Sequence, residues 1–426
     1  MGNKTFKIHN KTSSNNLLFF ILIFYYLCAT IMPFVSQISG GLFYMSIVML
    51  LYFLIFFNNH DSLNRYIIFI IPFLPIVLLN LTSIFLSGQA NPLVFIYQQL
   101  VILIPSIICF YLLIGNKRKS IKWILCVSLI AFLVTAITSY FGLKDNPFAA
   151  RFLATVSDSK DINAVSFNMK NIGGYTTVYS VVLIFPMIIC MYKQKKISPF
   201  FMLPITIVIG LYILSTQYAT ALMLFILSLT LFAFPKHIGR KKIVIICIIV
   251  VISLVILKPL LIILLNFIGS SVKSDTLSER FNYLAQTLNG VQNTSDVGAR
   301  RDVLMLSLNS FVKNPLLGGV FLNSYSVGGH SYILDNFVKY GLLGVASLFL
   351  MYIQIFKKLY YPFINTEYYG YMILSLMQAL VLSTINTGNF LFVIAFVIPL
   401  IGYVLQNKNY KSTKGGAILF ENSLDN

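Results

Sequence analysis

The chain has 426 residues, of which 58% are hydrophobic and only 10% are charged, and its mean hydropathy is +0.84. A water-soluble protein of this length needs far more polar surface, so the composition excludes a soluble globular protein and indicates a polytopic membrane protein. The formal net charge of +19 would suit a nucleic-acid-binding protein, but the positions of the basic residues indicate membrane topology instead.

Twelve stretches are long and apolar enough to cross a bilayer, which takes about 20 mostly apolar residues. They cover approximately residues 17–35, 41–57, 66–86, 93–114, 121–142, 175–192, 199–215, 218–234, 243–263, 341–356, 368–385 and 389–405. All five cysteines lie in apolar stretches without metal-ligand spacing. We therefore predict an all-α membrane protein with about twelve transmembrane helices, forming one integral membrane domain over residues 1–426.

The basic residues gather in alternate connecting segments, as the positive-inside rule requires. With the N-terminus inside, 20 of the 31 basic residues lie in predicted cytoplasmic segments, at positions 4, 7, 11, 65, 117, 118, 119, 122, 193, 195, 196, 236, 240, 241, 242, 357, 358, 408, 411 and 414. The short outer turns 36–40, 87–92, 215–218 and 386–388 hold none. The sequence thus predicts cytoplasmic N- and C-termini, attraction to anionic membrane lipid and no nucleic-acid partner.

Two predicted outer segments are too long to be turns. The first covers residues 143–174 and the second covers residues 264–340. Within the second, Ser295 and Asp296 predict the start of a helix that ends near Lys313, before Pro315. The spacing of Leu304, Leu308 and Phe311 predicts the packing face of this helix, with Ser307 and Ser310 away from it.

The second outer segment also holds the residues best suited to chemistry. His330 follows Gly328 and Gly329 and is the only histidine on the predicted outer side. A histidine suits acid–base work near neutral pH, and Asp335, five residues on, could orient it. The alternative is a surface histidine without a catalytic role.

Three arginines of the same segment, Arg280, Arg300 and Arg301, form a candidate anion site, because the planar guanidinium matches phosphate oxygens. An interfacial anchor to lipid phosphates is the alternative reading of these arginines. Motifs for nucleotide binding and clustered metal ligands are absent from the sequence.

The order of these motifs resembles the O-antigen polymerase and ligase family. The resemblance rests on Gly298-Ala299-Arg300, then Leu304, Asn314-Pro315-Leu316-Leu317-Gly318-Gly319, His330 and Gly341-Leu342-Leu343-Gly344. Two positions depart from the family pattern. Gln217 stands where the family often has arginine, and Leu304 stands where it often has tryptophan. Arg151 or Arg280 could supply the phosphate contact that Gln217 lacks.

The resemblance implies a GT-C-like membrane glycosyltransferase that needs no cofactor and no metal. It would polymerise repeat units of O-antigen or capsular polysaccharide carried on undecaprenyl diphosphate, at the outer face of the bacterial cytoplasmic (inner) membrane. His330 and Arg300 would be catalytic, with Arg301, Arg280, Arg151, Asp335 and Gln217 in substrate binding. A chain-length regulator and a flippase are further candidate partners.

Two other functions fit the same sequence. A ligase would transfer finished glycan from the same donor to another acceptor. A flippase or transporter of lipid-linked sugars would also need many spans, but such proteins usually carry ionisable groups near the midplane of the membrane.

Overall fold

The computed structural model describes residues 12–57, 63–87, 92–115, 117–155, 161–234, 258–271, 278–279, 281–282, 285–286, 296–319, 327–329, 331–386 and 390–406. These residues form helices and connecting turns, and no strand occurs among them. The chain is therefore an all-α protein over its described part, as the sequence predicts.

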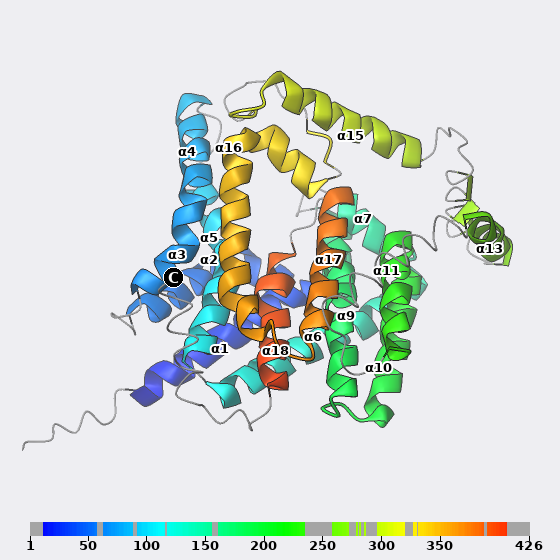
Figure 1. Cartoon of the computed structure of the whole chain (residues 1–426), viewed down its shortest axis with the longest axis horizontal. Helices are drawn as coiled ribbons and strands as arrows, with labels where there is room; N and C mark the ends of the chain where they lie inside the picture. Colours follow the sequence, from blue (N-terminus) through cyan, green and yellow to red (C-terminus); the bar gives the residue numbers. More distant parts are fainter. Residues whose placement is uncertain are drawn as a thin grey trace, which may run out of the picture.

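The helices of the first half are α1 (Thr12–Ile31), α2 (Pro33–Phe57), α3 (Leu63–Ile70), η2 (Ile71–Phe73), α4 (Leu74–Ser87), α5 (Pro92–Ile114), α6 (Arg118–Asp145), α7 (Ala149–Thr155), α8 (Ile162–Met169), α9 (Tyr175–Lys193) and α10 (Pro199–Thr216). Those of the second half are α11 (Ala219–Leu229), η3 (Thr230–Phe232), α13 (Lys258–Ser271), α15 (Asp296–Lys313), α16 (Tyr332–Ile355), η4 (Phe356–Tyr360), η5 (Tyr361–Phe363), α17 (Tyr369–Ile385), η6 (Val393–Val397) and α18 (Ile398–Leu405). Figure 1 shows most of them as a bundle, with α15 lying across one end.

In the described part of the chain, five helical segments are long and apolar enough to cross a membrane. They are Pro33–Phe57, Arg118–Asp145, Tyr175–Lys193, Pro199–Thr216 and Tyr332–Phe363. Shorter apolar helices lie in most of the other predicted spans, for example Leu100–Ile114 and Tyr369–Ile385. The predicted span 243–263 falls mostly outside the described residues. The chain is thus a helical membrane protein, and the count of twelve spans stays a prediction.

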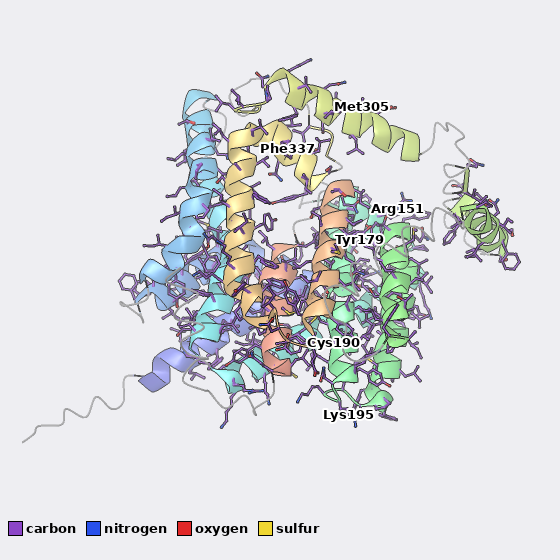
Figure 2. The ribbon with its side chains drawn as sticks, viewed as in Figure 1. Arg151, Tyr179, Cys190, Lys195, Met305 and Phe337 are labelled. Atoms are coloured by element: carbon purple, nitrogen blue, oxygen red, sulfur yellow. The ribbon has the colours of Figure 1, made fainter. Side chains whose placement is uncertain are left out.

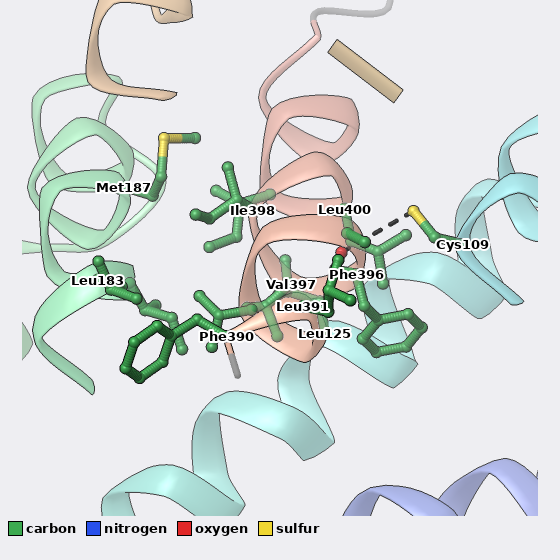
Figure 3. Packing of buried hydrophobic residues seen from close by; sticks show 14 of the residues in the cluster. Cys109, Leu125, Leu183, Met187, Phe390, Leu391, Phe396, Val397, Ile398 and Leu400 are labelled. Atoms are coloured by element: carbon green, nitrogen blue, oxygen red, sulfur yellow. Dashed lines mark hydrogen bonds between the residues drawn. The ribbon is translucent and has the colours of Figure 1, made fainter. Parts of the chain in front are cut away.

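The apolar core is centred on η6 and α18, which contact α5, α6, α9 and α17. Phe396, Ile398 and Leu400 are fully buried there, and the Cys109 thiol lies 3.9 Å from the backbone oxygen of Phe396 (Figure 3). A helix that is apolar on all sides is stable only when neighbours surround it, which explains the central place of α18.

Segments predicted to be cytoplasmic meet at one end of the bundle, here called the lysine end, which includes Lys195 (Figure 2). Its contacts are Lys193 Nζ to the backbone oxygens of Phe232 and Phe234, Gln194 Nε2 to Glu367 Oε2, and the Arg118 guanidinium to the backbone oxygen of Gln406. Gln194 and Glu367 are far apart in the sequence, yet their polar atoms are 3.3 Å apart.

Segments predicted to be outer meet at the opposite end, here called the α7 end. Its contacts are Asn168 Nδ2 to Gln37 Oε1, the Phe34 amide to Asn171 Oδ1, Tyr218 Oη to the backbone oxygen of Ala150, and the Tyr332 amide to the backbone oxygen of Asn386. Segments predicted to share one side of the membrane therefore share one end of the molecule. Which end faces the cytoplasm stays a prediction.

Candidate functional site

Helix α15 has the predicted bounds, Asp296–Lys313, and contacts α16 at the α7 end of the bundle. It ends before Asn314, which precedes Pro315, because the residue before a proline is disfavoured in helical conformation. Phe311 of α15 packs on Phe337 of α16 with ring centroids 5.2 Å apart. Figure 2 labels Phe337 beneath α15.

The predicted packing face of α15 is wrong in one respect. Leu308 is 41% exposed, whereas Ser307, which was predicted to point away, is only 1% exposed. Apolar spacing alone assigned Leu308 to the buried side, but the inward face of α15 holds a hydrogen-bonding serine at its centre. The missed signal is that Ser307 lies four residues before the packed Phe311 and therefore shares its face.

Ser307 connects α15 to two other parts of the chain. Its hydroxyl donates to Asp335 Oδ1 at 3.1 Å and accepts the backbone N–H of Gly328 at 2.8 Å. Asp335 is 6% exposed and lies in the first turn of α16, where the helix N-terminus favours a negative charge. We call these three residues the Ser307 bridge. It is the only place among the described residues where a serine joins a buried carboxylate to a loop amide.

Gly328 and Gly329 have different structural roles. A Cβ at Gly328 would lie 2.2 Å from the backbone oxygen of Val303, so only glycine allows this close approach to α15. Gly329 has a φ of +74° and open space around it, so glycine is favoured there by the left-handed backbone conformation and not by lack of room for a side chain. Glycine is therefore needed at position 328 for the close approach to α15 and at position 329 for the backbone conformation.

The chain is also anchored on the other side of position 330. Ser331 Oγ accepts the backbone N–H of Leu334 at 3.2 Å and so caps α16. The Tyr332 amide donates to the backbone oxygen of Asn386 at 2.8 Å. The residues that flank position 330 are therefore held by α15, by the cap of α16 and by the segment that follows α17.

The Gly318-Gly319 motif and the Gly341–Gly344 motif of the sequence meet in a second contact between α15, the segment that follows it, and α16. Helix α16 is kinked at Gly341, which has a φ of +61°. The kink leaves backbone groups without partners inside the helix. Segment 314–319 supplies those partners: the Leu342 amide donates to the Pro315 oxygen at 2.8 Å, and the Gly319 amide donates to the Val338 oxygen at 2.7 Å.

Glycine is required on both sides of this contact. A Cβ at Gly341 would lie 2.3 Å from the backbone oxygen of Leu316, and a Cβ at Gly318 would lie 2.5 Å from the amide nitrogen of Gly341. We call this contact the glycine joint. Helix α16 begins at Tyr332, so position 341, where the sequence predicts the start of a span, is a kink within this helix.

A third group of predicted residues meets near α7. Gln217 ends α10 in the left-handed conformation, with a φ of +60°, and is 5% exposed. The next residue, Tyr218, donates from its hydroxyl to the backbone oxygen of Ala150 at 2.9 Å. Arg151 of α7 is close enough to Tyr218 for an electrostatic interaction, and Figure 2 labels it near Tyr179. The structure thus brings Arg151 to the turn that carries Gln217.

Aromatic rings surround this turn. Tyr218 packs on Tyr175 with centroids 5.7 Å apart, and Tyr179 packs on both Tyr175 and Phe390. Phe390 lies four residues after Asn386, which binds the first turn of α16. Asn386 thus contacts the first turn of α16, which carries Asp335, and Phe390 contacts Tyr179 beside Tyr218.

The remaining predicted residues are placed only in part. His330 and Arg280 lie outside the described residues. Arg300 and Arg301 belong to α15 by their backbone, while their side chains lie outside the description. Position 300 precedes Ser307 by seven residues, or about two turns of 3.6 residues, so its backbone is on the Ser307 face of the helix. Position 301 is rotated away from that face.

The described residues of this region offer hydrogen-bonding groups and one buried carboxylate, Asp335. No group of three or more His, Cys, Asp and Glu side chains that could hold a metal ion occurs within the described ranges. The arrangement places a helix that carries two arginines against a buried carboxylate and a glycine-rich turn. The described contacts hold the Gly328–Gly329 turn and the first turn of α16 against α15, the helix whose sequence contains Arg300 and Arg301.

No protein-family model matches the chain, and no curated protein matches it.

Proposed function

We propose that the protein is a membrane glycosyltransferase that polymerises lipid-linked oligosaccharide repeat units of an O-antigen or capsular polysaccharide. The single observation that carries the proposal is the Ser307 bridge. It binds the turn before position 330 and the carboxylate of Asp335 to α15, the helix whose sequence contains Arg300 and Arg301. The motifs that resemble the O-antigen polymerase family therefore belong to segments that contact one another.

The proposed donor is a glycan on undecaprenyl diphosphate. Outside the cytoplasm there are no nucleotide sugars, so the energy of the glycosidic bond has to arrive in a lipid-linked diphosphate. In the reaction, an acceptor sugar hydroxyl attacks the anomeric carbon of the donor and forms a new C–O bond. The bond between that carbon and the diphosphate oxygen breaks, and undecaprenyl diphosphate leaves with the electron pair.

Each candidate residue has a separate role in this step. His330 accepts the proton of the attacking hydroxyl, a role worth about 10²–10⁴ in rate. Arg300 binds the diphosphate and stabilises the charge that develops as the bond breaks, and loss of one such donor costs about 10²–10³. The helical register favours Arg300 over Arg301, because position 300 is on the face of Ser307. Arg301 and Arg280 support the same anion.

Arg151 is the proposed replacement for the arginine that the family often has at the position of Gln217. Its support is the contact of the Ala150–Arg151 backbone region with Tyr218, the residue after Gln217. The enzyme would act at the outer face of the bacterial cytoplasmic membrane. A flippase that delivers the donor and a chain-length regulator are the proposed protein partners.

The test compares alanine variants of the two principal residues in cells that display the polysaccharide. His330→Ala and Arg300→Ala should each remove the ladder of long chains and leave a single repeat unit. Arg301→Ala should have a smaller effect, and His237→Ala, at a histidine of a predicted cytoplasmic segment, should leave the ladder unchanged. Protein abundance in the membrane is measured for every variant. A full ladder from His330→Ala at normal abundance would refute its role as base.

The same gels separate a polymerase from a ligase. Loss of a polymerase leaves single repeat units on the final acceptor. Loss of a ligase leaves long polymer on the carrier lipid, which mild acid releases from the diphosphate. If polymer accumulates on the carrier lipid in the Arg300→Ala strain, the protein is a ligase and the polymerase proposal is wrong.

A further inference from the structure

Three segments that are distant in the sequence meet at the hydroxyl of Ser307. This hydroxyl uses its proton for Asp335 and its lone pair for the Gly328 amide, and it is 1% exposed. A buried hydroxyl costs free energy unless it is hydrogen-bonded, and here both of its hydrogen-bonding functions are used. Packing of α15 on α16 is already provided by Phe311 and Phe337.

The position of the bridge gives it a specific consequence. Gly328 lies two residues before position 330, and Asp335 lies five residues after it. The backbone of position 300 lies about two helical turns before Ser307 on the same helix. The Ser307 hydroxyl is therefore the side-chain group that bonds both the Gly328–Gly329 turn and the first turn of α16 to the helix that contains position 300.

We propose that Ser307 is a positioning residue: its hydroxyl, held between Asp335 and Gly328, fixes the Gly328–Gly329 turn and the first turn of α16, which flank the proposed base His330 in the sequence, against the helix that contains position 300. This inference rests on the proposed function. A side chain that is correctly placed for proton transfer loses rate steeply when it moves, by roughly 10²-fold for a displacement of about 1 Å. Removal of the hydroxyl should therefore slow the chemical step more than it weakens donor binding.

The experiment measures polymerisation by the purified full-length protein, with synthetic undecaprenyl-diphosphate-linked repeat units as the substrate. Ser307→Ala should lower kcat by roughly 10- to 100-fold, with the KM for the donor within about twofold of the wild type. Ser307→Thr keeps a hydroxyl and should recover most of the kcat. Rates are expressed per folded protein, as measured by size-exclusion chromatography.

Ser128→Ala is the matched control. Ser128 is also fully buried, but its hydroxyl bonds only to the Ile124 oxygen of its own helix. This variant removes the same atom from an equally buried site and should keep the wild-type kcat. If Ser307→Ala does not fold, Ser307→Cys keeps the volume with a weaker donor, and it should show a lowered kcat that the threonine variant does not share.

A double-mutant cycle tests the bridge itself. Because Ser307 and Asp335 act through one hydrogen bond, the Ser307→Ala/Asp335→Ala protein should be little slower than the slower single variant. Multiplying effects, or a wild-type kcat for Ser307→Ala, would overturn the inference. So would losses confined to the amount of folded protein. His330→Ala is run in parallel: an active His330→Ala refutes the proposed function, whereas an inactive one beside an active Ser307→Ala refutes the positioning role alone.

Discussion

The two long polar segments of the sequence are built in different ways. The first, residues 143–174, ends in a side-chain hydrogen-bond network around Asn171, which is 6% exposed. Asn171 Nδ2 donates to Thr138 Oγ1 at 2.9 Å, and the Phe34 amide donates to Asn171 Oδ1 at 3.3 Å. The second segment is held by the glycine joint, in which backbone groups of 314–319 bond to the kinked α16.

The difference lies in what each contact requires from the sequence. The Asn171 network needs particular polar side chains on α6 and a left-handed asparagine, with a φ of +54°. The glycine joint needs only the absence of a Cβ at Gly318 and Gly341, because its hydrogen bonds come from the main chain. Side chains of α15 and α16 therefore take no part in the joint, and residues such as Ser307 and Asp335 are available for other contacts.

The largest effect is expected at the glycine joint. Gly341→Ala combines a left-handed φ with a Cβ that would collide with the Leu316 oxygen, and we expect a loss of about 3 kcal/mol or more in stability. Gly40→Ala is the matched control, because Gly40 has a φ of +68° and no atom within 4 Å of the added Cβ. It should lose only about 1 kcal/mol.

Thermal unfolding in detergent, followed by size-exclusion chromatography, measures both glycine variants. If the two variants lose equal stability, the close approach of the two backbones contributes nothing to the requirement for glycine at position 341. The positive φ alone would then explain that requirement.

A smaller loss is expected in the Asn171 network. Asn171→Ala removes the side-chain hydrogen bonds to Thr138, Thr135 and the Phe34 amide in a buried site, and we expect a cost of about 2–3 kcal/mol in stability. Asn171→Gly has no strain at positive φ, so a similar loss in this variant assigns the cost to the hydrogen bonds. Lys195→Ala is the control for positive φ, since Lys195 has a φ of +57° and is exposed.

Activity decides whether the two segments also differ in function. The Asn171 variants should keep the wild-type rate per folded protein, because the network is structural. A rate that falls more than the amount of folded protein would show that the first segment contributes to catalysis through Asn171. The two segments would then not differ in function.

The smallest effect is expected at Arg151, the one residue of the first segment with a proposed role in substrate binding. Arg151→Ala should lower activity by about tenfold, less than the ~10²–10³ expected for a principal donor such as Arg300. Lys144→Ala removes a charge from the same segment, where Lys144 lies over the Tyr140 ring at 4.9 Å, and should have no effect on the rate.

A second-site change sharpens the Arg151 prediction. If Arg151 replaces the arginine that the family often has at position 217, Gln217→Arg should restore part of the activity of Arg151→Ala. In the otherwise wild-type protein the same change should not help, because it adds a second cation beside Arg151. If both proteins fold and no activity is restored, Arg151 does not replace an arginine at position 217.

Much of the architecture follows from local properties of the sequence. Apolar stretches of 17–25 residues form helices in a membrane because every backbone polar group has to be paired within the segment. The bounds of α15 follow equally from local signals, the start at Asp296 and the stop before Pro315. The site was harder to predict, since Leu308 and Ser307 exchange the positions that apolar spacing assigns to them.

The sequence by itself therefore determined the class of the protein, the helices and the two polar segments, because each depends on residues that are close together along the chain. Only the tertiary structure decided which parts of those segments meet. It joined Ser307 to Asp335 and Gly328, Arg151 to the turn at Gln217, and Gly318 to Gly341. These contacts depend on distances between residues that are far apart in sequence, and no local pattern contains that information.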